Sequence, residues 1–149
     1  MDKIKPFVKW AGGKGSLLQQ LNCYYPIELK DGCIDTYIEP FVGGGAVLID
    51  VLQNYKVKKA YAFDINKDLI NCYNVIKSNV NELINELKIK EQEFNSVSME
   101  NRPEYFYKIR DSYNSYELEE NELSIKRATE FIFLNRTCFN RIIQSKFTR

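Results

Sequence analysis

A run of three glycines stands where a buried strand would give way to a helix. Gly43-Gly44-Gly45 follows the apolar stretch 37–42, and residues 46–52 then have helical spacing. Consecutive glycines allow positive φ and let the backbone come close to a ligand, so this turn is typical of a cofactor site. Asp64 ends a second apolar run about twenty positions later, the spacing at which an acid binds ribose hydroxyls. Together these features predict a nucleoside cofactor.

Asp64 also has a purely structural interpretation. The residues after it open a helix, and Asp64 could be the N-cap of that helix. Asn66 could equally be the cap, which would leave Asp64 to contact a ligand. The sequence leaves both alternatives open.

A second glycine stretch, residues 10–16, lies near the N-terminus. It is not a nucleoside-triphosphate P-loop, because Val8 stands where the first glycine should be and Gly15 follows the lysine. Lys14 could instead bind a carboxylate, and the face of Trp10 could meet a cation. The alternative is that Trp10 is a core residue and Lys14 a solvated lysine in a turn.

Composition sets broad limits on the class of protein. The 149 residues, 44% of them hydrophobic, suit one globular domain with a real core, and the net charge of +1 does not by itself indicate a nucleic-acid partner. Acids predominate in residues 81–130, whereas residues 131–149 carry Arg136, Arg141, Lys146 and Arg149 and no acid. The chain therefore closes on a basic segment.

The titratable side chains exclude several kinds of chemistry. Four cysteines form no Cys-x-x-Cys pair and histidine is absent, so we expect reduced thiols, no metal site and no imidazole base. No apolar run has the roughly eighteen residues of a membrane span, and the N-terminus has no apolar core of a signal peptide. We expect a cytoplasmic protein without a membrane partner.

The elements that must position these residues alternate between strand and helix. Apolar runs predict strands at 36–41 and 60–64, joined through a helix at 46–54. This order predicts an α/β fold with a parallel sheet and a right-handed crossover. The next helix is expected to have one apolar face made of Leu69, Ile70, Tyr73 and Ile76.

From Val80 onward the sequence has no further strand signal, which predicts a helical insertion. Pro103 suits the first turn of a helix that runs to about Tyr113. An acidic connector, 117–122, separates it from a last helix at 122–135. The side chains predicted to point inward from that helix are Ile125, Ala128, Phe131, Ile132 and Leu134.

Four stretches in this order strongly resemble the Dam-type, D12-class DNA adenine-N6 methyltransferases: Phe7-Val8-Lys9-Trp10-Ala11-Gly12-Gly13-Lys14, Glu39-Pro40-Phe41-Val42-Gly43-Gly44-Gly45, Asp64-Ile65-Asn66 with Asp68-Leu69-Ile70, and Leu134-Asn135-Arg136 with Phe139-Asn140. The resemblance implies S-adenosyl-L-methionine as cofactor and a Rossmann-like methyltransferase fold with an incomplete sheet. It also implies a cofactor-binding part at 1–79 and a helical target-recognition region at 80–149.

The resemblance assigns roles residue by residue. The cofactor contacts that it implies are Trp10, Lys14, Gly43, Gly45 and Asp64. It implies double-stranded DNA as partner, with Arg136, Phe139 and Asn140 as nucleic-acid contacts and the aromatic ring stacking in the gap left by an extruded base. The alternative for this second set is structural: Arg136 could pair with the acidic insertion, and Phe139 could be core.

The sequence departs from the family pattern after Asn140. The family's catalytic Asp-Pro-Pro-Tyr motif is missing, and Arg141 to Arg149 stand where Gly-Leu-Tyr-Arg-Val-Asn is expected. One permitted coding of these residues, read one base later, encodes that expected sequence, so we hypothesise a frameshift or a split gene. The resemblance then implies an N-terminal portion of the enzyme with negligible turnover of its own.

Three functional hypotheses follow. The first is an N-terminal portion of a DNA adenine-N6 methyltransferase; an unpaired strand edge at 36–41 would then invite pairing with a complementary C-terminal fragment. The second is a catalytically inactive cofactor- or DNA-binding remnant. The third, a dinucleotide-dependent oxidoreductase, rests only on the glycine turn and Asp64 and leaves Trp10 and Lys14 unexplained.

Overall fold

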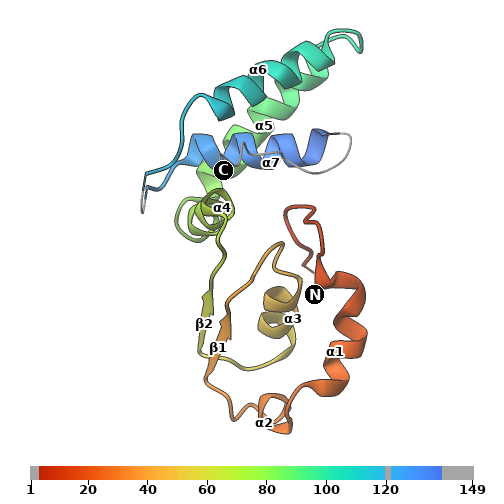
Figure 1. The fold of residues 1–149 in the computed structure, drawn as a ribbon, viewed down its shortest axis with the longest axis vertical. Helices are drawn as coiled ribbons and strands as arrows, with labels where there is room; N and C mark the ends of the chain where they lie inside the picture. The colour runs from red at the N-terminus through yellow and green to blue at the C-terminus, as the bar shows by residue number, and fades with distance from the viewer. Residues whose placement is uncertain (1–3, 120–121, 139–149) are drawn as a thin grey trace. The chain divides into compact units, whose positions relative to one another are not determined.

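The computed structural model describes residues 4–119 and 122–138, which form two compact units that divide between Ile65 and Asn66 (Figure 1). The first unit contains the sheet and the second is helical. In the first unit the elements are the 3-10 helix η1 (Lys14–Leu17), α1 (Leu18–Tyr24), α2 (Ile27–Lys30), β1 (Thr36–Glu39), α3 (Ala46–Asn54) and β2 (Lys59–Ala62). The predicted mixed α/β architecture with a parallel sheet is confirmed.

Strands β1 and β2 pair in parallel, with Thr36 opposite Lys59 and Glu39 opposite Ala62. Both strands end earlier than predicted. Strand β1 stops at Glu39 because Pro40 has no N–H to donate and the chain then enters the glycine turn. Two further hydrogen bonds extend the contact beyond the strands, from the Phe63 N–H to the Glu39 carbonyl at 2.8 Å and from the Val42 N–H to the Phe63 carbonyl at 2.9 Å.

The two faces of this small sheet differ. Tyr37 and Glu39 alternate with Thr36 and Ile38, so the two pairs point to opposite faces. Glu39 is buried, and helix α3 lies beside the strands in Figure 1. The opposite face is apolar but uncovered: Ile38 is 60% exposed, and its neighbour Tyr61 is 48% exposed.

Helix α3 has the bounds that the sequence predicted, 46–54. Its N-cap is Gly45, whose φ of +76° favours glycine. Leu48 and Val51 of this helix are buried and form the core of the first unit with Val8, Leu29 and Val42.

The second unit consists of helices α4 (Lys67–Ser78), α5 (Val80–Ser96), α6 (Arg102–Asn114) and α7 (Ile125–Thr137). Helix α7 packs against each of the other three. The predicted helical region from Val80 is therefore confirmed, as is a helix with Pro103 in its first turn. A functional boundary between residues 79 and 80 stays a prediction.

The predicted apolar face of α4 is partly wrong. Leu69 is buried as expected, but its buried companions are Cys72 and Val75. Ile70, Tyr73 and Ile76 are only half-buried. All four cysteines are free thiols, and burial raises the pKa of the Cys72 thiol well above its usual range.

Helix α7 starts three residues later than predicted, because the Ser124 side chain accepts a hydrogen bond from the Arg127 N–H at 3.2 Å and caps the helix. Asn71 of α4 fixes this start from outside: its amide donates to the Ser124 carbonyl at 2.8 Å and accepts from the Ser124 N–H at 2.9 Å. Ile125, predicted to point inward, is half-buried. Four polar residues that the sequence analysis did not place inside are buried in α7: Arg127, Thr129, Glu130 and Asn135.

Arg127 holds three helices of the second unit together. Its Nε lies 2.7 Å from Asp68 Oδ1 of α4, and its guanidinium stands 3.6 Å from the ring centroid of Tyr113 of α6. Its Nη1 also donates to the backbone carbonyls of Tyr113 and Tyr116. Desolvation is the largest single influence and lowers the pKa of Arg127, but the hydrogen bonds to Asp68 together with the charge interactions with Asp68, Tyr113 and Tyr116 outweigh it, so the net shift is upward.

Candidate cofactor site

The glycine turn forms one wall of the candidate site. Gly43 and Gly45 have φ values of +49° and +76°, and the Gly45 N–H donates to the Val42 carbonyl at 2.8 Å. A Cβ built on Gly43 would lie 2.9 Å from Cδ1 of Trp10, closer than real Cβ atoms approach. Only glycine therefore lets the N-terminal segment pack on this turn.

Asp64 closes the turn from the end of β2. Its Oδ2 accepts a hydrogen bond from the Gly43 N–H at 3.0 Å. The cap of α4 is Asn66, whose Oδ1 accepts from the Leu69 N–H at 2.9 Å. The structure thus decides between the two alternatives: Asp64 is not the helix cap, and it is held beside the glycine turn.

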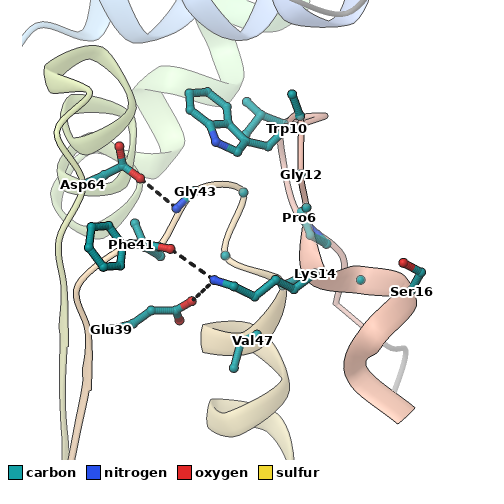
Figure 2. A pocket seen from close by; sticks show the side chains of 18 residues that line it. Pro6, Trp10, Gly12, Lys14, Ser16, Glu39, Phe41, Gly43, Val47 and Asp64 are labelled. Atoms are coloured by element: carbon teal, nitrogen blue, oxygen red, sulfur yellow. Dashed lines mark hydrogen bonds and ion pairs between the residues drawn. The ribbon is translucent and has the colours of Figure 1, made fainter. Parts of the chain in front are cut away.

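The opposite wall is the N-terminal glycine stretch. The Gly13 N–H donates to the Trp10 carbonyl at 3.1 Å, and Gly12 has a φ of +71°. This turn directs Lys14, at the start of η1, toward the end of β1. There its Nζ lies 3.7 Å from Glu39 Oε1 and 3.5 Å from the Phe41 carbonyl oxygen (Figure 2).

Glu39 is a residue that the sequence analysis did not select. It is 6% exposed, and its Oε2 accepts a hydrogen bond from the Tyr37 hydroxyl at 2.9 Å. Burial raises the pKa of the Glu39 carboxyl above its usual range, although Tyr37 and Lys14 both act to lower it. The sequence signal that could have identified Glu39 is an acid at the end of a predicted buried strand, next to a glycine turn.

These two walls enclose a cavity of about 420 Å³, within the range of small-molecule sites. All five predicted cofactor contacts line it: Trp10, Lys14, Gly43, Gly45 and Asp64. Figure 2 shows Trp10 and Lys14 projecting from one wall, and Glu39, Gly43 and Asp64 lying along the other. All of these residues belong to the first unit, so the cavity is complete within it.

The chemistry of this lining suits a nucleoside that carries an amino-acid group. Lys14 offers an ammonium to a carboxylate, and Asp64 offers a carboxylate to hydroxyls. A Cβ built on Gly12 or Gly15 meets nothing within 4 Å, so the backbone there is open to a ligand.

Of the predicted nucleic-acid contacts, only Arg136 lies in the described part of the chain. It is exposed in the last turn of α7. Phe139 and Asn140 lie outside the described residues, as does the basic segment 141–149. The structure therefore describes the position of Arg136 only, and the role of the three residues in DNA binding stays a prediction.

No helix in the part of the chain that the structure describes is both long enough and apolar enough to cross a membrane. No three metal-binding side chains come together in residues 4–119 and 122–138.

Comparisons with known proteins identify one family. Residues 10–149 match the family described as D12 class N6 adenine-specific DNA methyltransferase. The Type II methyltransferase M.MjaIII of Methanocaldococcus jannaschii is 51% identical over 138 residues, 93% of this chain and 47% of the relative. The DNA adenine methylase of Haemophilus influenzae is 36% identical over 138 residues, 93% of this chain and 42% of the relative.

A third relative, the Type II methyltransferase M1.LlaDCHI of Lactococcus lactis, is 32% identical over 137 residues, 92% of this chain and 42% of the relative. The chain spans less than half the length of these curated relatives but aligns over nearly all of its own. It belongs to the family of D12 class N6 adenine-specific DNA methyltransferases.

Proposed function

We propose that residues 1–149 bind S-adenosyl-L-methionine for methylation of adenine N6 in double-stranded DNA. The cavity that gathers Trp10, Lys14, Gly43, Gly45 and Asp64 carries this proposal. When bound, S-adenosyl-L-methionine supplies a methyl group on a positively charged sulfur. Lys14 would bind the carboxylate of its methionine part, and Asp64 would bind its ribose hydroxyls.

The protein's own groups fix this arrangement before any ligand arrives. The Gly43 N–H holds Asp64, and Glu39 and the Phe41 carbonyl hold Lys14. Such preorganisation improves binding because the ligand need not order these side chains itself. In this proposal β1, α3 and β2 are the first part of a Rossmann-like methyltransferase sheet.

Binding is the activity that we assign to residues 1–149. Their sequence contains no Asp-Pro-Pro-Tyr motif, so the groups that would contact the flipped adenine are not among them. We therefore expect cofactor binding, and negligible methyl transfer, from these 149 residues by themselves.

The experiment uses the single tryptophan of the chain, Trp10, which lines the cavity. Titration with S-adenosyl-L-methionine should change its fluorescence with a saturable curve. NAD, the ligand of the rival oxidoreductase hypothesis, should produce a weaker effect at equal concentration. A stronger response to NAD would favour that hypothesis instead.

We further propose that Arg136, with Phe139 and Asn140, contacts DNA within a recognition region that spans 80–149. Arg136 supports this by its exposed position at the end of α7. Arg136→Ala should lower the affinity for duplex DNA in fluorescence anisotropy. Arg110→Ala is the matched control, since Arg110 is a similarly exposed arginine on α6. Equal losses in both variants would leave only general electrostatic attraction.

The exposed apolar face of the sheet, which carries Ile38 and Tyr61, suggests that a polypeptide partner binds there. Parallel sheets are normally buried on both faces, yet Ile38, Tyr61 and Phe63 are about half exposed or more here. We propose that this face binds polypeptide equivalent to the part of the relatives that this chain does not span. Adding the remaining half of M.MjaIII should then restore methyl transfer to DNA, and Ile38→Asp should prevent it. The cytoplasmic location stays a prediction.

A further inference from the structure

Acidic side chains outnumber basic ones among the described residues that line the cavity. Among the described lining residues, Lys14 carries the one ammonium, whereas Glu39 and Asp64 are carboxylates. With both acids ionised, the lining therefore has a net negative formal charge. A ligand with a net positive charge would be favoured there over a neutral ligand of the same shape.

Glu39 contributes more to this field than its pairing with Lys14 suggests. The side chain of Glu39 is 7% exposed, whereas that of Lys14 is 45% exposed. Water therefore screens the ammonium more than the carboxylate, because the effective dielectric falls with burial. At 3.7 Å the pair is also longer than a close charge-assisted hydrogen bond. The negative charge of Glu39 thus remains only partly compensated inside the cavity.

The two molecules that a methyltransferase must distinguish differ in this property. S-adenosyl-L-methionine carries a sulfonium, an ammonium and a carboxylate, so its net charge is positive. S-adenosylhomocysteine, left after methyl transfer, has a neutral thioether in place of the sulfonium and no net charge. The two are otherwise alike in their adenine, ribose and amino-acid groups.

We propose that Glu39 makes this cavity selective for the positively charged methyl donor over its neutral demethylated product, an inference that rests on the proposed function. The ammonium and carboxylate are common to both ligands, so their contacts do not discriminate. The sulfonium charge is present only in the donor, and the Glu39 carboxylate attracts it. Loss of that charge on methyl transfer weakens the attraction and favours release of the product.

The test compares two affinities in one variant. Glu39→Gln keeps the size of the side chain but removes its charge. The ratio of the dissociation constant for S-adenosylhomocysteine to that for S-adenosyl-L-methionine should fall roughly three- to tenfold, the effect of an interaction between unit charges that water largely screens. Trp10 fluorescence reports both ligands. General damage to the site would weaken both and leave the ratio unchanged.

Two other variants complete the design. Glu28→Gln makes the same chemical change on the exposed surface of α2 and should leave the ratio unaltered. Lys14→Met removes the compensating positive charge, so the ratio should rise while both ligands lose the contact with their carboxylate. This opposite sign keeps the proposal testable if Glu39→Gln fails to fold.

The outcomes separate the two proposals. If the unaltered chain binds neither ligand, the cofactor assignment falls and the selectivity falls with it. If it binds both but the ratio is the same in Glu39→Gln, or does not rise in Lys14→Met when Glu39→Gln is unfolded, only the role of Glu39 is overturned. A lower ratio in Glu39→Gln supports it.

Discussion

Gly43 is the residue at which the two walls of the cavity meet most closely. Its φ of +49° and the 2.9 Å approach to Trp10 both oppose a side chain. Gly43→Ala should therefore lower the free energy of unfolding by about 1–3 kcal/mol and weaken cofactor binding. Urea unfolding measures the first effect. Gly15→Ala is the control for stability, because its Cβ would meet nothing within 4 Å and its φ is not positive. A similar loss of stability in Gly15→Ala would show that the approach of Trp10 to Gly43 is not the cause.

Asp64 and Asn66 allow the roles of ligand contact and helix cap to be separated. Asp64→Ala should weaken binding of S-adenosyl-L-methionine in isothermal calorimetry, because it removes both the proposed ribose contact and the acceptor of the Gly43 N–H. Asn66→Ala should instead cost about 1 kcal/mol of stability through the lost cap and leave the affinity unchanged. Unchanged affinity in Asp64→Ala would remove that residue from the site.

The residues that line the cavity could be predicted from the sequence better than the contacts between them. All five predicted cofactor contacts line it. The glycine turn and the spacing to Asp64 are signals in the sequence itself, whereas the full set, with Trp10 and Lys14, came from the family resemblance. Glu39 was missed, since its partner Lys14 comes from a different segment and the contact depends on how the two walls pack. Local pattern cannot supply that information.

Helix α7 depends on a buried ion pair between elements far apart in the chain. Arg127 is 5% exposed and pairs with Asp68, 59 residues away. Arg127→Met should lower the free energy of unfolding by about 3–5 kcal/mol, because it leaves Asp68 and two backbone carbonyls without their partner. Urea unfolding of the chain measures this loss.

Arg110→Met provides the matched control for that measurement. Both side chains of the Arg110–Asp111 pair are exposed, and such ion pairs contribute about 0–1 kcal/mol to the free energy of unfolding. If Arg127→Met cost no more than this control, the ion pair with Asp68 would not be what holds α7 in place.

The first and last residues of a helix could be predicted where a particular residue in the sequence marks the boundary. Helix α3 was predicted correctly because Gly45 and the helical spacing after it are both local. The start of α7 was wrong because Ser124, its cap, was not recognised. Buried Arg127 was also missed, because an arginine in a helix is usually solvated and its partner Asp68 is distant in sequence.

The first unit combines the cavity with a two-stranded parallel sheet that has one exposed apolar face. The cavity is lined only by residues of that unit, whereas Ile38, Tyr61 and Phe63 remain exposed on the sheet face away from Glu39. The proposed cofactor binding can therefore be examined on these 149 residues, whose sequence contains no Asp-Pro-Pro-Tyr motif.

The most direct measurement is isothermal calorimetry of the 149-residue chain with S-adenosyl-L-methionine and, separately, with NAD. We expect one site for S-adenosyl-L-methionine and weaker binding of NAD, because Lys14 and Trp10 suit the amino-acid part of S-adenosyl-L-methionine. Absence of heat with S-adenosyl-L-methionine in a folded sample, or tighter binding of NAD, would contradict this expectation.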